Sequence, residues 1–444
     1  MDVDGGCCAR VTEAARINVR VLSYGSGVSA SNGRRKGLWT PAVLRLLRRR
    51  ELGVKAGISK AGAIARKELE EWADGLCARS HCLDYVKFPP GSGVRSTISV
   101  SFSPSGKYFA SSHGDHTVKV FLADHSAWDR NAEIPGLVHV LNGHPRTPWS
   151  VRFHPHSDRL IASGCLAGNL MIWKMLDNPA RVECIARCNL NTSAIISLAF
   201  HPTAEVIVAA AGTEVFVWPY LSGPPRSLEL HVPQSSLRSI NFYNKGAGII
   251  IGQTKPPRMA HVEGPGVMLN VYEVVMEGHR DLSLRKRGCV TSSCMIYNDS
   301  GLCVSPTGEY LITSCKSLRN RGLSITTISM NEHTFGKILL QSSFEMDMGG
   351  GFTSVQLSPT MNYVLVACGG SSRSRNLSQN GEELPACLIF HRESMEIVSA
   401  VRNSEDDLNI AVYHPLAGRG FVYGTKAGRL RHAWLGDADA DART

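Results

Sequence analysis

The sequence has no long hydrophobic run. Among its 444 residues the most apolar stretch is 206–221, and Gly, Thr, Glu and Pro residues interrupt it. A helix that spans a bilayer needs about 20 mostly apolar residues, so we expect no membrane span. Cysteine occurs 13 times, but no two cysteines stand at Cys-x-x-Cys spacing; Cys77 and Cys82, and Cys184 and Cys188, are too far apart. This spacing argues against a zinc knuckle and predicts reduced thiols in the cytoplasm or the nucleus.

Sequence motifs of the common enzyme classes are absent too. There is no glycine-rich phosphate-binding loop, no His-Glu-x-x-His helix and no Gly-x-Ser-x-Gly nucleophile elbow. We therefore expect a protein that is not an enzyme and that needs no metal ion or other cofactor.

The N-terminal part of the chain has too few acidic residues to balance its basic ones. Lys and Arg number 48 against 38 Asp and Glu, which gives a formal net charge of +10. Residues 1–95 hold 17 of these basic residues and 9 of the acidic ones, or +8, so the remainder is nearly neutral. Residues 1–37 are rich in Gly, Ser and Arg, which predicts a disordered basic segment. A plastid or mitochondrial transit peptide has a similar composition, although Asp2 and Asp4 argue against one.

The main positive feature is an internal repeat. An apolar strand, a polar turn, a second strand of small residues, another turn and a third strand recur seven times, and in six copies the first strand ends in Ser-Pro or His-Pro. One residue marks the first strand of each copy, at spacings of 42 to 62 residues: Phe102, Phe153, Phe200, Phe242, Val304, Leu357 and Tyr413. WD repeats have a period of about 40 to 45 residues, and the excess here is loop.

These repeats predict an all-β fold: a seven-bladed WD40-type β-propeller with an N-terminal helical extension. A four-stranded antiparallel blade cannot bury both faces alone, but blades stacked around an axis can. The seventh copy supplies only three strands before an Asp/Ala-rich tail, residues 436–444, that we expect to be disordered. Residues 82–88 are the expected donor of the missing outer strand. Their pairing would close a propeller of residues 82–435 and hide its exposed edges.

Two helices are predicted ahead of the propeller, within residues 38–75. A Thr-Pro pair at residues 40–41 fits an N-cap and a first helical position, and the helix would end at Gly53. The second helix is predicted from about residue 60 to residue 72, where apolar residues recur at helical spacing. Both are too short to be stable alone in water, so we expect them to pack against other surfaces.

Several stretches between residues 44 and 218 are more specific than the repeat pattern. They are GHPRTPWSVRFHP at residues 143–155, LIASGCL at 160–166, AIISLAFHPTA at 194–204, RST at 95–97, and RLL with RELGVKA within 45–56. These stretches closely resemble the WD-repeat region of one family of autophagy regulators, named activating molecule in Beclin-regulated autophagy. The match extends over roughly residues 44–218 and suggests a short, plant- or protist-like form.

In that family the propeller and its preceding helices bind the damaged-DNA-binding adaptor of the cullin-4 RING ubiquitin ligase. The resemblance implies a non-catalytic substrate receptor or scaffold, whose partners are this adaptor, protein substrates and autophagy proteins. Such a receptor acts by holding a protein substrate near the ubiquitin-loaded enzyme, because tethering raises the effective concentration of the substrate there. The resemblance also implies roles in autophagy and cell-cycle regulation. The sequence lacks the long segments that autophagy members carry, which favours the ligase role.

The residues expected to bind a partner lie mainly in the first predicted helix. Apolar side chains that share a helix with arginines suit a groove with an acidic rim. Two alternatives stay open: the helix packs on its own propeller, and the tryptophan ahead of the second blade is packed locally. The candidate partner-binding residues are Leu44, Arg45, Leu47, Arg48, Arg50, Leu52 and Trp149.

The sequence departs from the family pattern in two places. Many receptors for this adaptor carry Trp-Asp-x-Arg at a blade strand, whereas neither Trp173 nor Trp218 is followed by Asp and Arg. The aspartate that often completes a His-Ser-Trp network is replaced by Ala167, although His144 and Ser163 are present beside Trp173. We expect this blade to lose one buried hydrogen bond, about 1 kcal/mol. Adaptor binding would then depend more on the helices.

Two other functions stay open. A propeller-type hydrolase would assemble its site from loops at the mouth of the central channel. A nucleic-acid-binding scaffold would use the arginines within residues 45–50, but no aromatic platform accompanies them, which argues against that function.

Four histidines occupy equivalent or nearly equivalent turns of different repeats, so we interpret them as structural and not as metal ligands: His144, His154, His201 and His414.

Overall fold

This computed structural model describes most of the chain from residue 95 onward and three segments before it. The described residues are 20–23, 60–79, 82–86, 95–124, 128, 132–176, 181–190, 194–228, 230, 235–263, 266–278, 280–316, 322–343, 350–370, 385–402 and 407–434. Within them the helices are α2 (Lys60–Arg79), α3 (Pro257–Glu263) and two 3-10 turns. None of these described helices is long and apolar enough to cross a membrane.

Most of the described chain folds into antiparallel sheets of four strands. Three of them are β3 (Thr97–Phe102), β4 (Tyr108–His113), β5 (Val118–Leu122) and β6 (Leu137–Leu141); β7 (Pro148–His154), β8 (Ser157–Cys165), β9 (Asn169–Met175) and β10 (Val182–Asn189); and β11 (Ile195–Phe200), β12 (Ile207–Ala211), β13 (Glu214–Trp218) and β14 (Arg226–Leu228). Two more are β23 (Gly350–Leu357), β24 (Tyr363–Gly370), β25 (Pro385–His391) and β26 (Ile397–Arg402); and β27 (Leu408–Tyr413), β28 (Phe421–Thr425) and β29 (Leu430–Trp434) with β2 (Cys82–Val86).

One sheet has nine strands and combines two of the expected blades. Its first half is β15 (Leu237–Tyr243), β16 (Gly248–Thr254), β17 (Val267–Met276) and β18 (Leu282–Cys294). The second half is β19 (Leu302–Val304), β20 (Tyr310–Lys316), β21 (Leu323–Ser329), β22 (Ile338–Ser343) and β1 (Arg20–Ser23). The halves pair through Cys294 of β18 and Cys315 of β20. Because two expected blades share one sheet, the count of seven blades stays a prediction.

Strand β1 differs from the sequence-based expectation. It lies within residues 1–37, for which the composition predicts disorder, yet it pairs antiparallel with β22 from Arg20 opposite Ser343 to Ser23 opposite Leu340. The outer strand of a blade offers unpaired backbone groups, which can take up an extended segment of any composition. The other residues of 1–37 lie outside the described part of the chain.

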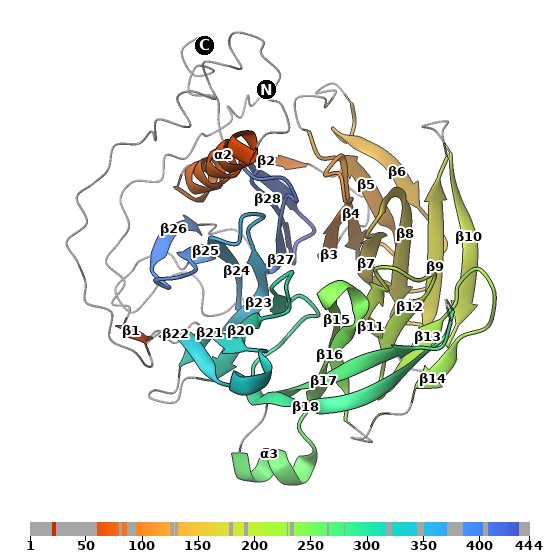
Figure 1. Cartoon of the computed structure of the whole chain (residues 1–444). Helices are drawn as coiled ribbons and strands as arrows, with labels where there is room; N and C mark the ends of the chain where they lie inside the picture. The colour runs from red at the N-terminus through yellow and green to blue at the C-terminus, as the bar shows by residue number, and fades with distance from the viewer. Residues whose placement is uncertain are drawn as a thin grey trace.

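The sheets are arranged as a ring around a central axis, and the first strands β3, β7, β11, β15, β23 and β27 lie nearest to it (Figure 1). In a β-propeller this axis is the central channel. Neighbouring inner strands run in the same direction: Val151 and Phe153 of β7 donate backbone hydrogen bonds to the hydroxyls of Ser99 and Ser101 on β3. Strands β19, β23 and β27 also contact in turn, and β27 returns to β3. The starts of the inner strands therefore share one face of the ring, the start face. The turns that follow these strands share the opposite face, the turn face.

Hydrophobic clusters between neighbouring sheets hold the ring together. One of them joins the first blade to the last: Phe109 and Phe121 stack with ring centroids 5.2 Å apart, and Ile410 and Val422 pack on the same cluster. Each fully buried side chain of this kind stabilises the fold by about 1.5–3 kcal/mol relative to its exposed state. The packing explains why one blade needs its neighbours, as the predicted all-β propeller requires.

The last sheet is completed by a strand from before the propeller. Strand β2 pairs antiparallel with β29, from Cys82 opposite Trp434 to Val86 opposite Leu430. This pairing brings the two ends of the repeat array together in one sheet. Residues 82–88 were the expected donor, and those of them that the structure describes lie in this position.

A serine recurs at the start of the inner strands, directly after a β-bulge. It is fully buried, and in three copies its hydroxyl accepts a hydrogen bond from a backbone N–H of the next inner strand, at N···O distances of 2.9 to 3.4 Å. A bulge re-aims the residue that follows it, here toward the neighbouring blade. The five serines at this position are Ser99, Ser150, Ser197, Ser239 and Ser354.

Candidate functional site

Helix α2 is fastened to the turn face of the propeller by one buried carboxylate. Asp74 is 5% exposed, and its Oδ2 accepts hydrogen bonds from the backbone N–H and the hydroxyl of Thr360, at 3.1 and 2.6 Å. Its Oδ1 accepts a hydrogen bond from the N–H of Gly418 at 3.1 Å. Thr360 and Gly418 belong to the turns after β23 and β27, so Asp74 joins two adjacent blades.

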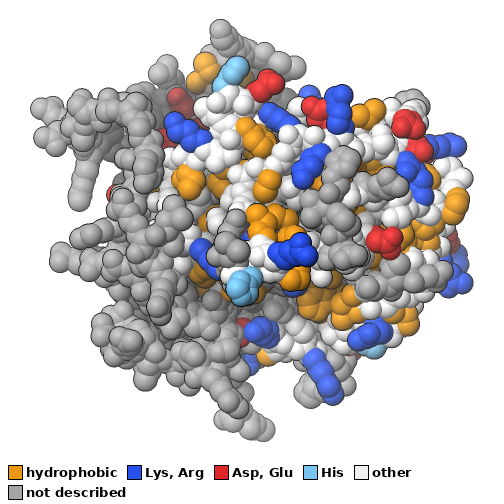
Figure 2. Space-filling model, turned by 90° about the horizontal axis from the view of Figure 1, so that it is seen from below, with side chains coloured by type: hydrophobic (Ala, Val, Ile, Leu, Met, Phe, Trp, Pro, Cys, Tyr) orange, Lys and Arg blue, Asp and Glu red, His pale blue; other side chains and the backbone are white. Residues whose placement is uncertain are grey.

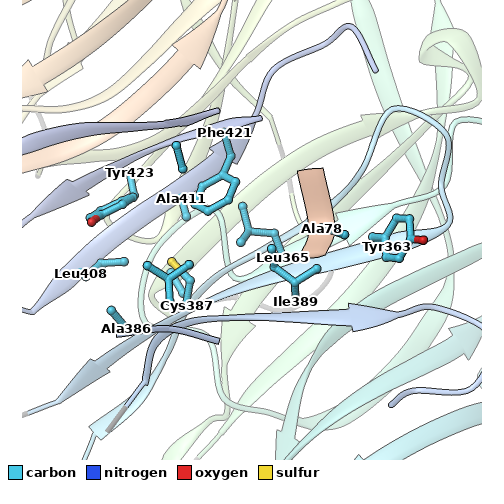
Figure 3. Close-up of a cluster of buried hydrophobic side chains, with 13 residues drawn as sticks. Ala78, Tyr363, Leu365, Ala386, Cys387, Ile389, Leu408, Ala411, Phe421 and Tyr423 are labelled. Atoms are coloured by element: carbon cyan, nitrogen blue, oxygen red, sulfur yellow. The ribbon is translucent and has the colours of Figure 1, made fainter. Parts of the chain in front are cut away.

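The last turn of α2 enters a hydrophobic cluster between these blades. Ala78 packs with Tyr363, Leu365 and Ile389, which come from β24 and β25 (Figure 3). The hydroxyl of Ser399 donates a 2.6 Å hydrogen bond to the carbonyl oxygen of Ala78, which would otherwise be left without a partner at the helix C-terminus. The helix is therefore longer than the predicted 60–72 because its last seven residues are stabilised by tertiary contacts.

Side chains near the beginning of α2 are exposed. Ile64 is 54% exposed, and the side chains of Arg66 and Lys67 are 79% and 77% exposed. The residues expected to bind the adaptor come just before this end: Leu44, Arg45, Leu47, Arg48, Arg50 and Leu52 lie outside the described residues. Their predicted role therefore stays a prediction.

A polar network closes part of the central channel at the start face. Asp299, in the loop before β19, accepts hydrogen bonds from Arg152 Nη2 at 2.6 Å and from the hydroxyl of Ser150 at 2.9 Å. Arg152 Nη1 also donates to the hydroxyl of Ser99 at 3.2 Å. These residues come from β7, β3 and the loop before β19, so one carboxylate links three parts of the ring that are far apart in sequence.

The loop that carries Asp299 also forms hydrogen bonds with the last blade and with β23. The side-chain amide of Asn298 donates to the carbonyl oxygen of Asn409 at 2.8 Å, and Asn409 in turn donates to the hydroxyl of Ser96 and the carbonyl oxygen of Thr97. The backbone N–H of Val355 donates to the carbonyl oxygen of Ser300. Residues 295–301, which we call the channel loop, are thus bonded to blades on several sides of the channel.

Two aromatic residues flank this network on the start face. Trp149, one of the predicted partner-binding residues, is partly exposed and directly precedes Ser150. Tyr297 is 47% exposed and lies two residues before Asp299. The hydrogen bond between Ser150 and Asp299 brings these two segments together. Trp149 therefore lies at the start of β7, on the start face. No sequence pattern singled out Tyr297, which lies in the loop bonded to Ser150.

The network of the second blade has the predicted gap. His144 Nε2 lies 2.6 Å from the hydroxyl oxygen of Ser163, which also accepts a 2.8 Å hydrogen bond from Trp173 Nε1. His144 Nδ1 is buried and has no hydrogen-bond partner, as expected where Ala167 replaces the usual aspartate. Burial lowers the pKa of His144 to about 4, with a smaller contribution from His116. The imidazole is therefore neutral at pH 7.

The other three histidines brace turns on the turn face. The Nδ1 atoms of His154, His201 and His414 each accept a hydrogen bond from the backbone N–H two residues later. Nε2 of His414 lies 2.9 Å from the carbonyl oxygen of Gly106 and donates to it, which ties the last blade to the first. Gly106 has a φ of +75°, and a Cβ there would lie 2.4 Å from the His414 ring. These contacts agree with the structural interpretation of the histidines.

The described ranges contain no group of three or more His, Cys, Asp and Glu side chains that is placed to hold a metal ion. The carboxylate of Asp299 forms an ion pair with Arg152. On the side of the molecule drawn in Figure 2, hydrophobic side chains form small groups with Lys and Arg between them and fewer Asp and Glu.

Comparison with known proteins identifies the repeats. The family described as WD domain, G-beta repeat matches residues 88–121 and 135–174. The described part of the chain has the fold of a WD40-type β-propeller. A solved structure, the β-propeller domain of Cps50 (Swd1) from Myceliophteria thermophila, has 16% sequence identity and a TM-score of 0.55, and covers 80% of this chain and 100% of that one. This similarity confirms the predicted fold class.

Curated relatives confirm the family resemblance over part of the chain. Activating molecule in BECN1-regulated autophagy proteins 1A and 1B from Danio rerio are 30% and 29% identical over 181 and 189 residues, which is 40% and 42% of this chain. Histone acetyltransferase type B subunit 2 from Debaryomyces hansenii is 29% identical over 87 residues, 20% of each chain. The matched region is only 13% of the length of each autophagy protein.

Sequence reasoning missed the two carboxylates that organise these surfaces. Asp74 resembles its acidic neighbours Glu70 and Glu71, and Asp299 stands in an Asn-Asp-Ser-Gly stretch that is typical of an ordinary turn. The bonding serines of the inner strands carry a clearer signal. Each stands three residues before the marker residue of its copy, and aligning the copies would have revealed this position.

Proposed function

We propose that this chain is a non-catalytic substrate receptor or scaffold of a cullin-4 RING ubiquitin ligase. Residues 44–52 would bind the damaged-DNA-binding adaptor, and a separate surface of the propeller would hold a protein substrate. The relatives named for BECN1-regulated autophagy support a place among autophagy proteins as well. Such a role would be carried out in the cytoplasm or the nucleus.

The attachment of α2 is the observation that carries this proposal. Asp74 and Ala78 hold the end of the helix on the turn face, while Ile64 and Arg66 near its beginning are exposed. The proposed docking segment therefore joins the propeller at a fixed point and from an unburied helix end. Leu52 precedes Lys60 by eight residues, so it lies no more than about 29 Å from the start of α2.

The channel mouth is the proposed place for a substrate. Trp149 and Tyr297 are partly or half exposed there, on the start face, whereas α2 is attached on the turn face. Aromatic side chains supply much of the binding energy at protein interfaces because they bury a large area at a small cost in side-chain entropy. With adaptor and substrate on opposite faces, neither would obstruct the other.

Co-purification with the recombinant adaptor tests the proposal. The full chain is compared with a variant that carries Leu44→Ala, Leu47→Ala and Leu52→Ala. A matched control replaces three exposed aliphatic residues elsewhere, namely Ile64→Ala, Leu221→Ala and Leu416→Ala. We expect at least tenfold weaker adaptor binding for the first variant and no change for the control, since hot-spot leucines contribute about 1–2 kcal/mol each.

A deletion sharpens the result. Removal of residues 1–59 takes away the proposed docking segment and strand β1, and leaves α2 and the contacts of its Asp74 in place. Equal recovery of the adaptor by the full chain and by this deletion would refute the docking role of residues 44–52. Trp149→Ala should leave adaptor binding unchanged and reduce the capture of a protein substrate, which separates the two surfaces.

A further inference from the structure

Two buried cysteines lie at the junction between the two halves of the nine-stranded sheet. Cys294 at the end of β18 is opposite Cys315 on β20, and this is the residue pair through which the halves are joined. Their sulfur atoms are 3.8 Å apart, and the residues are 0% and 4% exposed. Both are free thiols in the structure. Directly opposed residues of neighbouring antiparallel strands have Cα atoms about 4.5–5.5 Å apart, which lies within the range that a disulfide spans.

The surroundings of the pair give the two sulfurs different roles. The hydrogen bond with Cys294 lowers the pKa of Cys315, and hydroxyl groups of Thr326 and Ser293 add to this effect against the burial of the thiol. Burial raises the pKa of Cys294 well above its ordinary value. A thiolate is the nucleophile in thiol oxidation, so Cys315 is the residue that reacts first and Cys294 the one that follows.

We propose that Cys294 and Cys315 form an oxidation site at which hydrogen peroxide closes an intrachain disulfide across this junction. The Cys315 thiolate attacks one peroxide oxygen, the O–O bond breaks, and a sulfenic acid and hydroxide result. This hydroxide takes up the proton that the Cys315 thiol released, which gives the first water. The Cys294 sulfur then attacks the sulfenic sulfur, its proton combines with the departing hydroxide, and water is released. Two thiols and one peroxide thus yield one disulfide and two waters. Peroxide is small and uncharged, so brief local opening of the junction suffices for its entry.

The disulfide would also restrain the channel loop, because that loop begins at the next residue. The backbone N–H of Met295 donates a 2.8 Å hydrogen bond to the carbonyl oxygen of Ser314, directly beside the cysteine pair. Four residues later Asp299 is bonded to Arg152 in the channel. A covalent bond at Cys294 therefore fixes one end of the segment that carries Tyr297. Oxidation would therefore reduce the mobility of the channel loop on the start face and leave the exposed side chains there unchanged.

Peptide mapping of the full chain after mild peroxide treatment tests the proposal. Free thiols are alkylated, and the chain is cut with trypsin and a glutamate-specific protease. These enzymes leave Cys315 alone on residues 310–316, and leave Cys294 on residues 288–309 with Cys289 and Cys303. We expect these two peptides to be recovered joined together. The joined species should be lost in Cys294→Ala and retained in Cys289→Ala, a matched change at an exposed thiol of the same strand.

Two further readouts keep the test decisive. Fragmentation of the joined peptides from the unaltered chain locates the bond even where Cys294→Ala fails to fold. Hydrogen exchange of residues 295–301 should become slower after oxidation, and reductant should reverse this change. Recovery of Cys315 as an alkylated thiol after peroxide, or a joined species that persists in Cys294→Ala, would overturn the proposal. Unchanged exchange in the channel loop would overturn its effect on the start face.

Discussion

Arg152 on β7 lies 2.6 Å from Asp299, a residue 147 positions later in the chain, and this ion pair binds the channel loop to the opposite part of the ring. The carboxylate of Asp299 is 5% exposed and the guanidinium side chain of Arg152 is 24% exposed. Breaking one partner of such a pair is costly because the other charge is left poorly solvated. The pair therefore constrains the channel loop more than an exposed ion pair would.

Asp299→Asn should destabilise the fold by about 2 kcal/mol, since it leaves Arg152 without its counter-charge while keeping the shape of the side chain. The matched control is Glu273→Gln, which removes the partner of Arg285 in a pair whose side chains are 46% and 74% exposed. That change should cost less than about 0.5 kcal/mol. Urea unfolding monitored by tryptophan fluorescence gives both values, and equal effects would contradict the special role of Asp299.

Ala167→Asp should stabilise the second blade by about 1–2 kcal/mol. The new carboxylate would accept a hydrogen bond from His144 Nδ1, which is buried without a partner. The equivalent residue of the first blade, Asp115, already bonds to the backbone and hydroxyl of Thr117 there. Thermal unfolding measures the gain. Leu166→Asp, one residue earlier, serves as the control, and a gain that persists when His144→Gln is added would show that the new carboxylate acts elsewhere.

Protonation of His144 should lower the free energy of unfolding as the pH falls from about 6.5 to about 4. Its pKa of about 4 is below the unfolded value of about 6.5, so the unfolded chain takes up the proton first as the pH falls. Stability from this group is complete above pH 6.5, declines toward pH 4 and then levels off, by up to about 3 kcal/mol in total. His144→Gln should flatten the dependence of the urea midpoint on pH between 6.5 and 4. Parallel curves for the two proteins would contradict it.

The repeat pattern predicted the fold because period-two strands and turn residues are local signals. The same locality explains what could not be predicted. The pairing of Arg152 with Asp299 depends on how the inner strands are arranged in space. The residues next to Asp299 in the sequence do not indicate this arrangement. Likewise the helix predicted to end near residue 72 extends to Arg79, because Ser399 and the hydrophobic cluster around Ala78 stabilise turns whose own sequence signals are weak.

Asp74→Ala should release helix α2 from the propeller. The change removes three hydrogen bonds, two from Thr360 and one from Gly418, and leaves partly buried donors without their acceptor. We expect a loss of about 2–3 kcal/mol in stability and faster hydrogen exchange across α2. Glu70→Ala is the control, because its partner Arg66 is 79% exposed and their ion pair contributes little. Unchanged exchange in α2 after Asp74→Ala would show that other contacts hold the helix.

Pairing of β2 with β29 should make the last blade exchange as one unit. We expect the amides of residues 82–86 that bond to β29 to be protected as well as those of β27, β28 and β29, because β2 joins the two ends of the repeat array in one sheet. The exposed start of α2 provides the contrast within the same experiment, since its amides should exchange sooner. Native-state exchange read by mass spectrometry resolves these segments. Fast exchange at residues 82–86 with slow exchange in β28 would mean that the ring is held closed by packing between the first and last blades, through Phe109 and Val422, and not by this strand.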